Sequence, residues 1–132
     1  DCMVSNVADH TIVREALTQR MRQMLAAPGV LGLVADGRDA GTIIFPDAAL
    51  QVFVEVPLEV RAARRHAQNV GKGIDSNLSE ITAALADRDA RDAARGDAAP
   101  QVTKRSRLLN NSTQTVEEAI GCLLAWTAEN NV

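Results

Sequence analysis

The seven residues at positions 50–56, LQVFVEV, constrain the fold of this chain more than any other stretch. A short apolar run rich in valine and phenylalanine is typical of a β-strand, and burial on both of its faces is typical of a parallel sheet covered by helices. Pro57 follows the run at once, and proline favours the first position of a helix. We therefore expect a strand buried on both faces that leads directly into a helix.

Helical and strand-like patterns alternate along the rest of the chain. Apolar residues recur at spacings of three and four in amphipathic segments, which predict helices over 9–29, 57–70, 76–96 and 112–131. Ser76 and Gly96 are the expected N-cap and stop of the third helix, and Thr115 with Glu118 matches a capping box in the last. Apolar runs at 30–36 and 107–111 predict two more strands. The resulting order, α-β-β-α-α-β-α, predicts one α/β layered domain over residues 1–132.

The composition excludes several classes of protein. The formal net charge is -3, so no overall basic field attracts nucleic acid or an anionic membrane surface. No apolar run approaches the roughly 20 residues of a membrane span. Cys2 and Cys122 are the only cysteines, and their separation predicts neither a disulfide framework nor a zinc site. We expect a cytoplasmic protein, and the absence of an initiator methionine indicates a fragment or a processed product.

Charged residues follow the apolar run 30–36 directly, in the order Asp36, Gly37, Arg38 and Asp39. Ligands of open α/β sheets bind at the carboxyl ends of the strands, so these charged residues lie where a binding or active site is expected. Asp36 could hold a magnesium ion, Arg38 could bind a phosphate, and Asp39 could accept a hydrogen bond from an amino group. The same residues also fit a plain strand-to-turn connection, in which an aspartate caps the turn and the arginine pairs with it.

A second charged group lies on the predicted helix over 76–96. Arg88, Asp92 and Arg95 stand at i, i+4 and i+7, which places them on one stripe with Arg91 beside them. Such a face could neutralise a polyphosphate while Asp92 accepts from sugar hydroxyls, or it could be a solvated helix with weak ion pairs. The same two alternatives, ligand contact or surface exposure, apply to the arginines after the strand 50–56, namely Arg61, Arg64 and Arg65.

Taken together, these stretches resemble the cytidylate kinase family, the bacterial CMP kinases of the nucleoside monophosphate kinase group. The matching segments are VREAL at 13–17, ADGRDAGTIIFPDA at 35–48, the strand with EVRAARR at 59–65, GK at 71–72, and RDARDAAR at 88–95. The resemblance extends from Ser5 to Arg95 and, less closely, to Ala128. It implies a parallel sheet of the P-loop nucleoside-kinase type with a helical lid, of which this chain is the C-terminal two-thirds.

The resemblance implies a role for individual residues. Ser5 and Arg14 correspond to contacts with the cytosine, Asp39 to the carboxylate that reads its exocyclic amino group, and Arg38 to the group that binds the CMP phosphate. Arg88, Asp92 and Arg95 correspond to lid residues that touch the sugar and the phosphates. The three arginines of this set, Arg38, Arg88 and Arg95, are the expected catalytic groups, because phosphoryl transfer needs alignment and charge neutralisation more than a nucleophile.

The donor side of the reaction is implied in the same way. Arg64 corresponds to an arginine that packs on the ATP adenine, and Asp36 to a strand-end acid near Mg²⁺. By the same resemblance, residues 1–27 form the end of the NMP-binding insertion with the helix after it, and residues 71–96 form the lid region. The full protein would transfer the γ-phosphoryl group of ATP to CMP or dCMP. The presence of Asp39 together with Ser5 and Arg14 argues against a nucleoside monophosphate kinase that prefers a base other than cytosine.

The sequence departs from the family in one large respect. It contains no G-x-x-x-x-G-K-[ST] phosphate loop, and VGKGID at 70–75 lacks both the leading glycine and the hydroxyl after the lysine. We expect the family's N-terminal strand to be missing with that loop, which leaves an apolar flank uncovered. We therefore expect the chain alone to be inactive. The alternative to a kinase is a non-catalytic chain that self-associates or binds nucleotide weakly.

Overall fold

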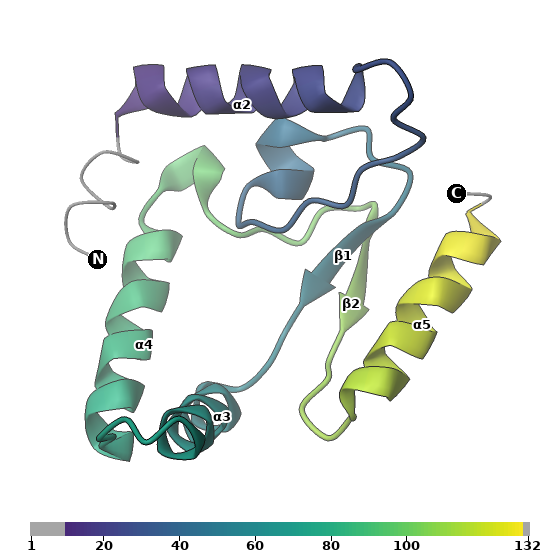
Figure 1. Ribbon diagram of the computed structural model, residues 1–132. Helices are drawn as coiled ribbons and strands as arrows, with labels where there is room; N and C mark the ends of the chain where they lie inside the picture. The colour runs from purple at the N-terminus through teal and green to yellow at the C-terminus, as the bar shows by residue number, and fades with distance from the viewer. Residues whose placement is uncertain (1–9, 131–132) are drawn as a thin grey trace.

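The computed structural model describes residues 10–130 as a mixed α/β arrangement with a small parallel sheet (Figure 1). Its elements follow in the order α2 (Thr11–Leu25), the π-helical turn η1 (Ala40–Ile44), β1 (Gln51–Val54), α3 (Leu58–Gly71), α4 (Leu78–Ala93), the 3-10 turn η2 (Gly96–Ala98), β2 (Ser106–Leu109) and α5 (Val116–Glu129). None of the helices in this described part is long and apolar enough to cross a membrane.

The sheet consists of β1 and β2, which pair in parallel from Gln51 opposite Ser106 to Val54 opposite Leu109. Figure 1 shows α5 beside β2. Arg107 joins these two elements: its Nη1 lies 2.6 Å from the Glu129 carboxylate, and its guanidinium lies 5.4 Å from the centre of the Trp126 ring. The expected strand over 107–111 is thus present, one residue earlier and shorter.

The strand predicted over residues 30–36 is not formed. This stretch has no strand hydrogen bonding, and the side chains of Leu31 and Val34 are almost wholly exposed. A strand is stable only when its backbone groups pair with a neighbouring strand, and among the described residues the sheet contains only β1 and β2. The prediction of a strand over 30–36 is therefore wrong, because an apolar pattern alone does not supply the neighbouring strand that pairing requires.

The prediction that residues 50–56 are buried on both faces is also wrong. Only residues 51–54 are a strand; Gln51 is buried, Val52 and Phe53 are half-buried, and Val54 is exposed. A two-stranded sheet offers a neighbour on one edge only, and burial on both faces requires a helical layer on each side. The polar residue is therefore the one inside: Gln51 donates to the Pro46 carbonyl at 2.7 Å and accepts from the Thr103 hydroxyl at 2.9 Å.

The helix ends confirm some of the predicted signals and correct others. The capping box of α5 is present, with the Glu118 amide donating to Thr115 Oγ1 and the Thr115 amide donating to the Glu118 carboxylate. The N-cap of α4 is Asn77 rather than Ser76, because the Asn77 side chain accepts from the amides of residues 79 and 80. Pro57 is the cap residue before α3 and not its first helical residue.

The end of α4 sets the position of a charged side chain. The helix stops at Ala93, before the predicted end, so Arg95 lies beyond the helix and precedes η2. Gly96 has φ of +59°, a backbone conformation that glycine adopts without a Cβ penalty. This bend turns the chain from α4 into η2. Because η2 in turn contacts η1, and η1 contacts α2, three segments distant in sequence meet at one end of the molecule.

Candidate functional site

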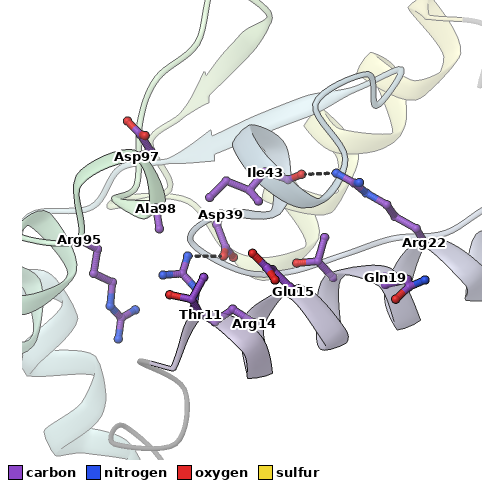
Figure 2. A pocket seen from close by; sticks show the side chains of 11 residues that line it. Thr11, Arg14, Glu15, Gln19, Arg22, Asp39, Ile43, Arg95, Asp97 and Ala98 are labelled. Carbon is purple, nitrogen blue, oxygen red and sulfur yellow. Dashed lines mark hydrogen bonds and ion pairs between the residues drawn. The ribbon is translucent and has the colours of Figure 1, made fainter.

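A cavity of about 550 Å³ lies between α2, η1 and the bend that follows α4 (Figure 2). One face of α2 forms one wall, the start of η1 forms a second, and the bend before and within η2 forms the third. The lining residues are Thr11, Arg14, Glu15, Thr18, Gln19 and Arg22 from α2, Asp39 and Ile43 from the η1 region, and Arg95, Asp97 and Ala98. The walls carry both arginines and carboxylates.

Arg14 and Asp39 face each other across this cavity. Arg14 Nη2 lies 3.4 Å from Asp39 Oδ2, and both side chains are about one-third exposed or less. Asp39 is the residue immediately before η1, so the turn presents its carboxylate to α2. The family resemblance implied that both residues contact one base, and the structure brings them together although 25 positions separate them.

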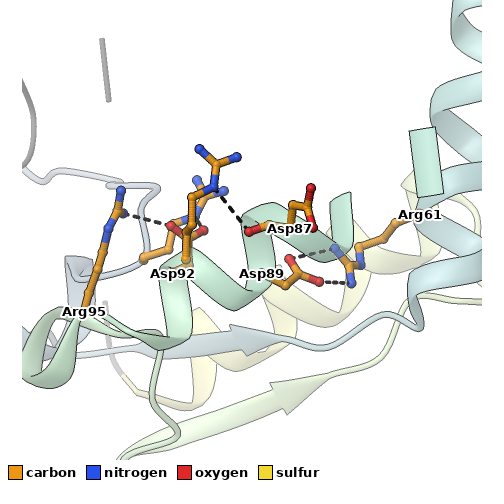
Figure 3. A network of polar contacts seen from close by, with 7 residues as sticks. Arg61, Asp87, Asp89, Asp92 and Arg95 are labelled. Atoms are coloured by element: carbon orange, nitrogen blue, oxygen red, sulfur yellow. Dashed lines mark hydrogen bonds and ion pairs between the residues drawn. The ribbon is translucent and has the colours of Figure 1, made fainter. Parts of the chain in front are cut away.

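Asp92 links two of the predicted phosphate-binding arginines. Its side chain is only 10% exposed, with Oδ2 at 3.0 Å from Arg38 Nε and Oδ1 at 2.9 Å from Arg95 Nη1 (Figure 3). A buried carboxylate needs such partners, because an unpaired buried charge is costly. The carboxylate therefore holds two guanidinium groups beside the same helix end: that of Arg95, three residues later, and that of Arg38, 54 positions away.

Of this network only Arg95 lines the cavity, and the remaining predicted residues that the structure describes lie outside both the network and the cavity. Arg88 is exposed on α4 and makes no hydrogen bond or ion pair with any described residue, so the three-residue stripe is divided. Asp36 is exposed at the end of the unpaired stretch 30–36. Arg64 donates from Nη1 to Asn111 Oδ1 at 3.0 Å and from Nη2 to the carbonyls of residues 111 and 112, away from the cavity. Ser5 lies outside the described residues.

Within residues 10–130, no three His, Cys, Asp or Glu side chains gather closely enough to hold a metal ion. Magnesium bound to a nucleotide usually keeps several waters and takes one or two carboxylates together with phosphate oxygens. Asp36 could be one such carboxylate ligand, and phosphate and water would then supply the rest of the coordination shell. The predicted role of Asp36 stays a prediction.

Several lining residues were not predicted. Thr11, Glu15, Thr18, Gln19 and Arg22 form the polar face of α2 together with Arg14. Their spacing of three and four residues was visible in the sequence, but the same spacing describes any solvated helix face. Arg22 stands out because Nε donates to the Ile44 carbonyl at 2.8 Å and Nη2 donates to the Ile43 carbonyl at 2.6 Å.

The cavity walls carry three arginines and three carboxylates, the latter from Glu15, Asp39 and Asp97, so they suit a polar ligand that has both an anionic group and hydrogen-bond donors. Arg14 and Arg95 supply positive charge at two sides, while Asp39 supplies an acceptor for an amino group. A fixed arginine fork matches phosphate or carboxylate oxygens, and an adjacent carboxylate adds selectivity for a hydrogen-bond donor. A nucleotide, which combines an anionic phosphate with a base that carries hydrogen-bonding groups, is a ligand of this kind.

Comparison with known proteins specifies the family. A family model described as "Cytidylate kinase" matches residues 1–129. The cytidylate kinase of Burkholderia ambifaria (strain MC40-6) is 46% identical over 122 residues, which cover 92% of this chain and 52% of that protein. The cytidylate kinase of Cupriavidus pinatubonensis is 44% identical over 124 residues, 94% of this chain and 55% of that protein. The chain belongs to the cytidylate kinase family, and it spans about half the length of the curated relatives it matches, less than the two-thirds that the resemblance implied.

Proposed function

We propose that this chain forms the CMP-binding part of a cytidylate kinase, which transfers the γ-phosphoryl group of ATP to CMP or dCMP and yields CDP or dCDP with ADP. The convergence of Arg14, Asp39 and Arg95 on one cavity carries the proposal. A cytosine offers an exocyclic amino group to Asp39, and a 5′-phosphate offers oxygens to the arginines. The finer fold assignment, a P-loop nucleoside-kinase sheet with a lid over 71–96, belongs to the same proposal.

The ion pairs around Asp92 give the phosphate arginines a defined resting position. Arg38 and Arg95 both lie within 3.0 Å of the Asp92 carboxylate, and a phosphate group would compete with that carboxylate for their N–H groups. When some of these N–H groups donate to the phosphate instead, the Asp92 carboxylate oxygens become available to accept a hydrogen bond from a sugar hydroxyl. Arg88 would join from the exposed face of α4 when that helix closes over the ligand.

Binding of the phosphoryl donor, ATP, needs more groups than the described residues supply. Magnesium, bound with ATP, would neutralise charge on the transferred phosphoryl group, and Asp36 is the residue of this chain proposed to lie near it. Arg64, on α3, is proposed to pack on the adenine, beside the loop over residues 110–112 to which it is hydrogen-bonded. A phosphate loop is absent from this sequence, so the triphosphate would be held by a segment outside these 132 residues.

The experiment that tests the proposal is a titration of the ¹⁵N-labelled chain with CMP, followed by amide NMR, with UMP as the matched control ligand. We expect CMP to shift the amide signals of Arg14, Asp39, Ile43 and Ala98, and to bind more tightly than UMP. Shifts confined to residues outside the cavity, or equal affinity for the two nucleotides, would contradict the proposal.

A second candidate function is favoured by a separate observation. The stretch 30–36 exposes Leu31 and Val34 almost completely, and it is not paired with either of the two strands found in the described residues. Exposed apolar side chains on unpaired backbone favour association with another chain. The alternative is therefore that the chain, by itself, is a non-catalytic, self-associating protein with weak nucleotide affinity.

A further inference from the structure

Arg22 makes an unusual set of contacts for a residue on the polar face of a helix. Its guanidinium donates to two consecutive backbone carbonyls, those of Ile43 at 2.6 Å and Ile44 at 2.8 Å (Figure 2). The residues lie 21 and 22 positions away, so the contact joins α2 to the far end of η1. The planar guanidinium suits this task because its N–H groups diverge in a fixed fork.

The two carbonyls have a structural need for these donors. In η1 the amides of Ile43 and Ile44 donate back to the Asp39 carbonyl, and the amide of Phe45 donates to the Ala40 carbonyl. The carbonyls at the end of such a short helical turn have no later amide within the turn to pair with. Arginine side chains commonly bind carbonyls at helix C-termini for this reason.

Helix α2 therefore holds η1 at both ends. Arg14 contacts Asp39 at the start of the turn, and Arg22, eight residues later on the same helix, contacts its end. The first contact is a partly exposed ion pair at 3.4 Å, a kind of pair that is weak in water. A ligand that binds Arg14 or Asp39 would also compete with the ion pair between these two side chains. The bonds of Arg22 go to backbone oxygens, so ligand binding at the carboxylate leaves them intact.

We infer that Arg22 is a positioning residue, which fixes the turn 40–44 against α2 and thereby sets the placement of Asp39 opposite Arg14. Its effect on base selectivity rests on the function proposed above, whereas its effect on the Arg14–Asp39 pair does not. Arg22 itself need not touch the base. The two consequences can therefore be measured separately.

The first test needs no ligand. The Nε–H signal of Arg14 is recorded by ¹⁵N NMR in the wild-type chain and in Arg22→Met, Arg22→Lys and Asp39→Asn. We expect Arg22→Met to move the Arg14 signal toward its position in Asp39→Asn, and Arg22→Lys to move it less. The matched control is Arg20→Met, since Arg20 is exposed on the same helix and makes no hydrogen bond or ion pair with the described residues. An Arg14 signal that stays at its wild-type position in Arg22→Met overturns the inference, even if the variant is less stable.

The second test measures affinity for CMP and UMP by calorimetry with the same variants. We expect Arg22→Met to lower the preference for CMP over UMP at least roughly threefold and at most about 10²-fold, the effect that a 1 Å misplacement of a reacting group can have. Arg22→Lys should recover part of the preference, and Arg20→Met should not change it. If the wild-type chain shows no preference for CMP, the proposed function fails, and the NMR signal of Arg14 still decides the role of Arg22. A preference that survives in Arg22→Met while the Arg14 signal moves would overturn the link to selectivity.

Discussion

Asp92 joins two of the arginines that we assign to phosphate binding. It is the most buried charged residue of the described chain, and it bridges guanidinium groups from two segments. Its neighbours are one-third or more exposed, so each arginine can turn to water when the carboxylate is lost. Removing the carboxylate should therefore cost less than breaking a fully buried ion pair, but more than breaking a surface pair.

The first prediction follows from that balance. Asp92→Asn should lower the free energy of unfolding by about 1–2 kcal/mol, because the amide accepts with one oxygen only and carries no charge. Urea denaturation measures the change. Asp87→Asn, on an exposed position of the same helix, is the control and should change stability by no more than about 0.5 kcal/mol. Equal effects of the two substitutions would show that the bridge to Arg38 and Arg95 contributes nothing to stability.

The second prediction concerns base selection by Asp39. A carboxylate that accepts from the cytosine amino group meets a carbonyl when UMP is bound, and both acceptors then remain unpaired. Asp39→Ala should narrow the preference for CMP over UMP by one or more powers of ten, measured by calorimetric titration. Asp47→Ala, an almost fully exposed carboxylate, is the control and should leave the preference unchanged. A preference retained in Asp39→Ala would exclude Asp39 as the group that reads the base.

The third prediction distinguishes the roles of Arg88 and Arg95, which the sequence places on one stripe of a predicted helix. Arg95 lines the cavity and pairs with Asp92, whereas Arg88 is exposed on the helix. In the whole protein, Arg95→Ala should lower kcat more than it weakens CMP binding, because the charge it meets is greatest during phosphoryl transfer. Steady-state kinetics with Arg88→Ala and Arg91→Ala alongside measure the contrast. Unchanged kcat and CMP affinity in Arg95→Ala would indicate that Arg95 is only a solvated surface residue.

At the scale of elements, arginine side chains connect segments that are distant in the sequence. Arg61 on α3 donates to the Val56 carbonyl at 3.0 Å and binds both oxygens of Asp89 on α4, at 3.2 and 2.6 Å (Figure 3). Arg105, in the loop before β2, binds the Ala48 carbonyl at 3.2 Å in the same manner. These polar contacts link the elements around the site, in addition to the packing of α3 against α4.

The fourth prediction tests which residue begins α4. Asn77 Oδ1 accepts from the amides of Ser79 and Glu80, while Ser76 Oγ lies 3.0 Å from His66 Nδ1 and so points to α3. Asn77→Ala should cost about 1 kcal/mol of stability and speed amide exchange at residues 79 and 80. Ser76→Ala should leave the exchange of those two amides unchanged. Hydrogen exchange by NMR measures both variants, and faster exchange in Ser76→Ala alone would restore Ser76 as the cap.

At the scale of the whole molecule, the core is small. Its buried apolar residues within the described range are Ile44, Leu109 and four alanines at 62, 98, 99 and 119. No large side chain among them is fully buried. Burial of apolar area is the main favourable term in folding, so a core built mostly of alanine stabilises the chain weakly. Exposed apolar side chains remain available for contact with other surfaces.

The fifth prediction concerns the 132-residue chain by itself. It should show no CMP-dependent ATP consumption above background in a coupled assay, because no phosphate loop in this sequence holds the triphosphate. Light scattering should find a species larger than a monomer. Leu31→Asp with Val34→Asp should shift it toward the monomer, while Val116→Asp, an exposed residue on α5, should not. A monomeric wild-type chain that turns over CMP and ATP would contradict both parts.

The sequence by itself determined the approximate extent of the long helices and the family to which the chain belongs. Periodic apolar residues, the Thr115–Glu118 capping box and the segments DGRD and RDARDAAR act over a few positions, so their consequences can be read locally. Only the tertiary structure decided which candidates meet. It left residues 30–36 unpaired, brought Arg14 to Asp39 and Arg38 to Asp92, and placed Arg22 on the carbonyls of η1. The physical reason is that strand pairing and side-chain contacts across 20 or more residues depend on partners distant in the chain, whereas helix formation depends on neighbours within one or two turns.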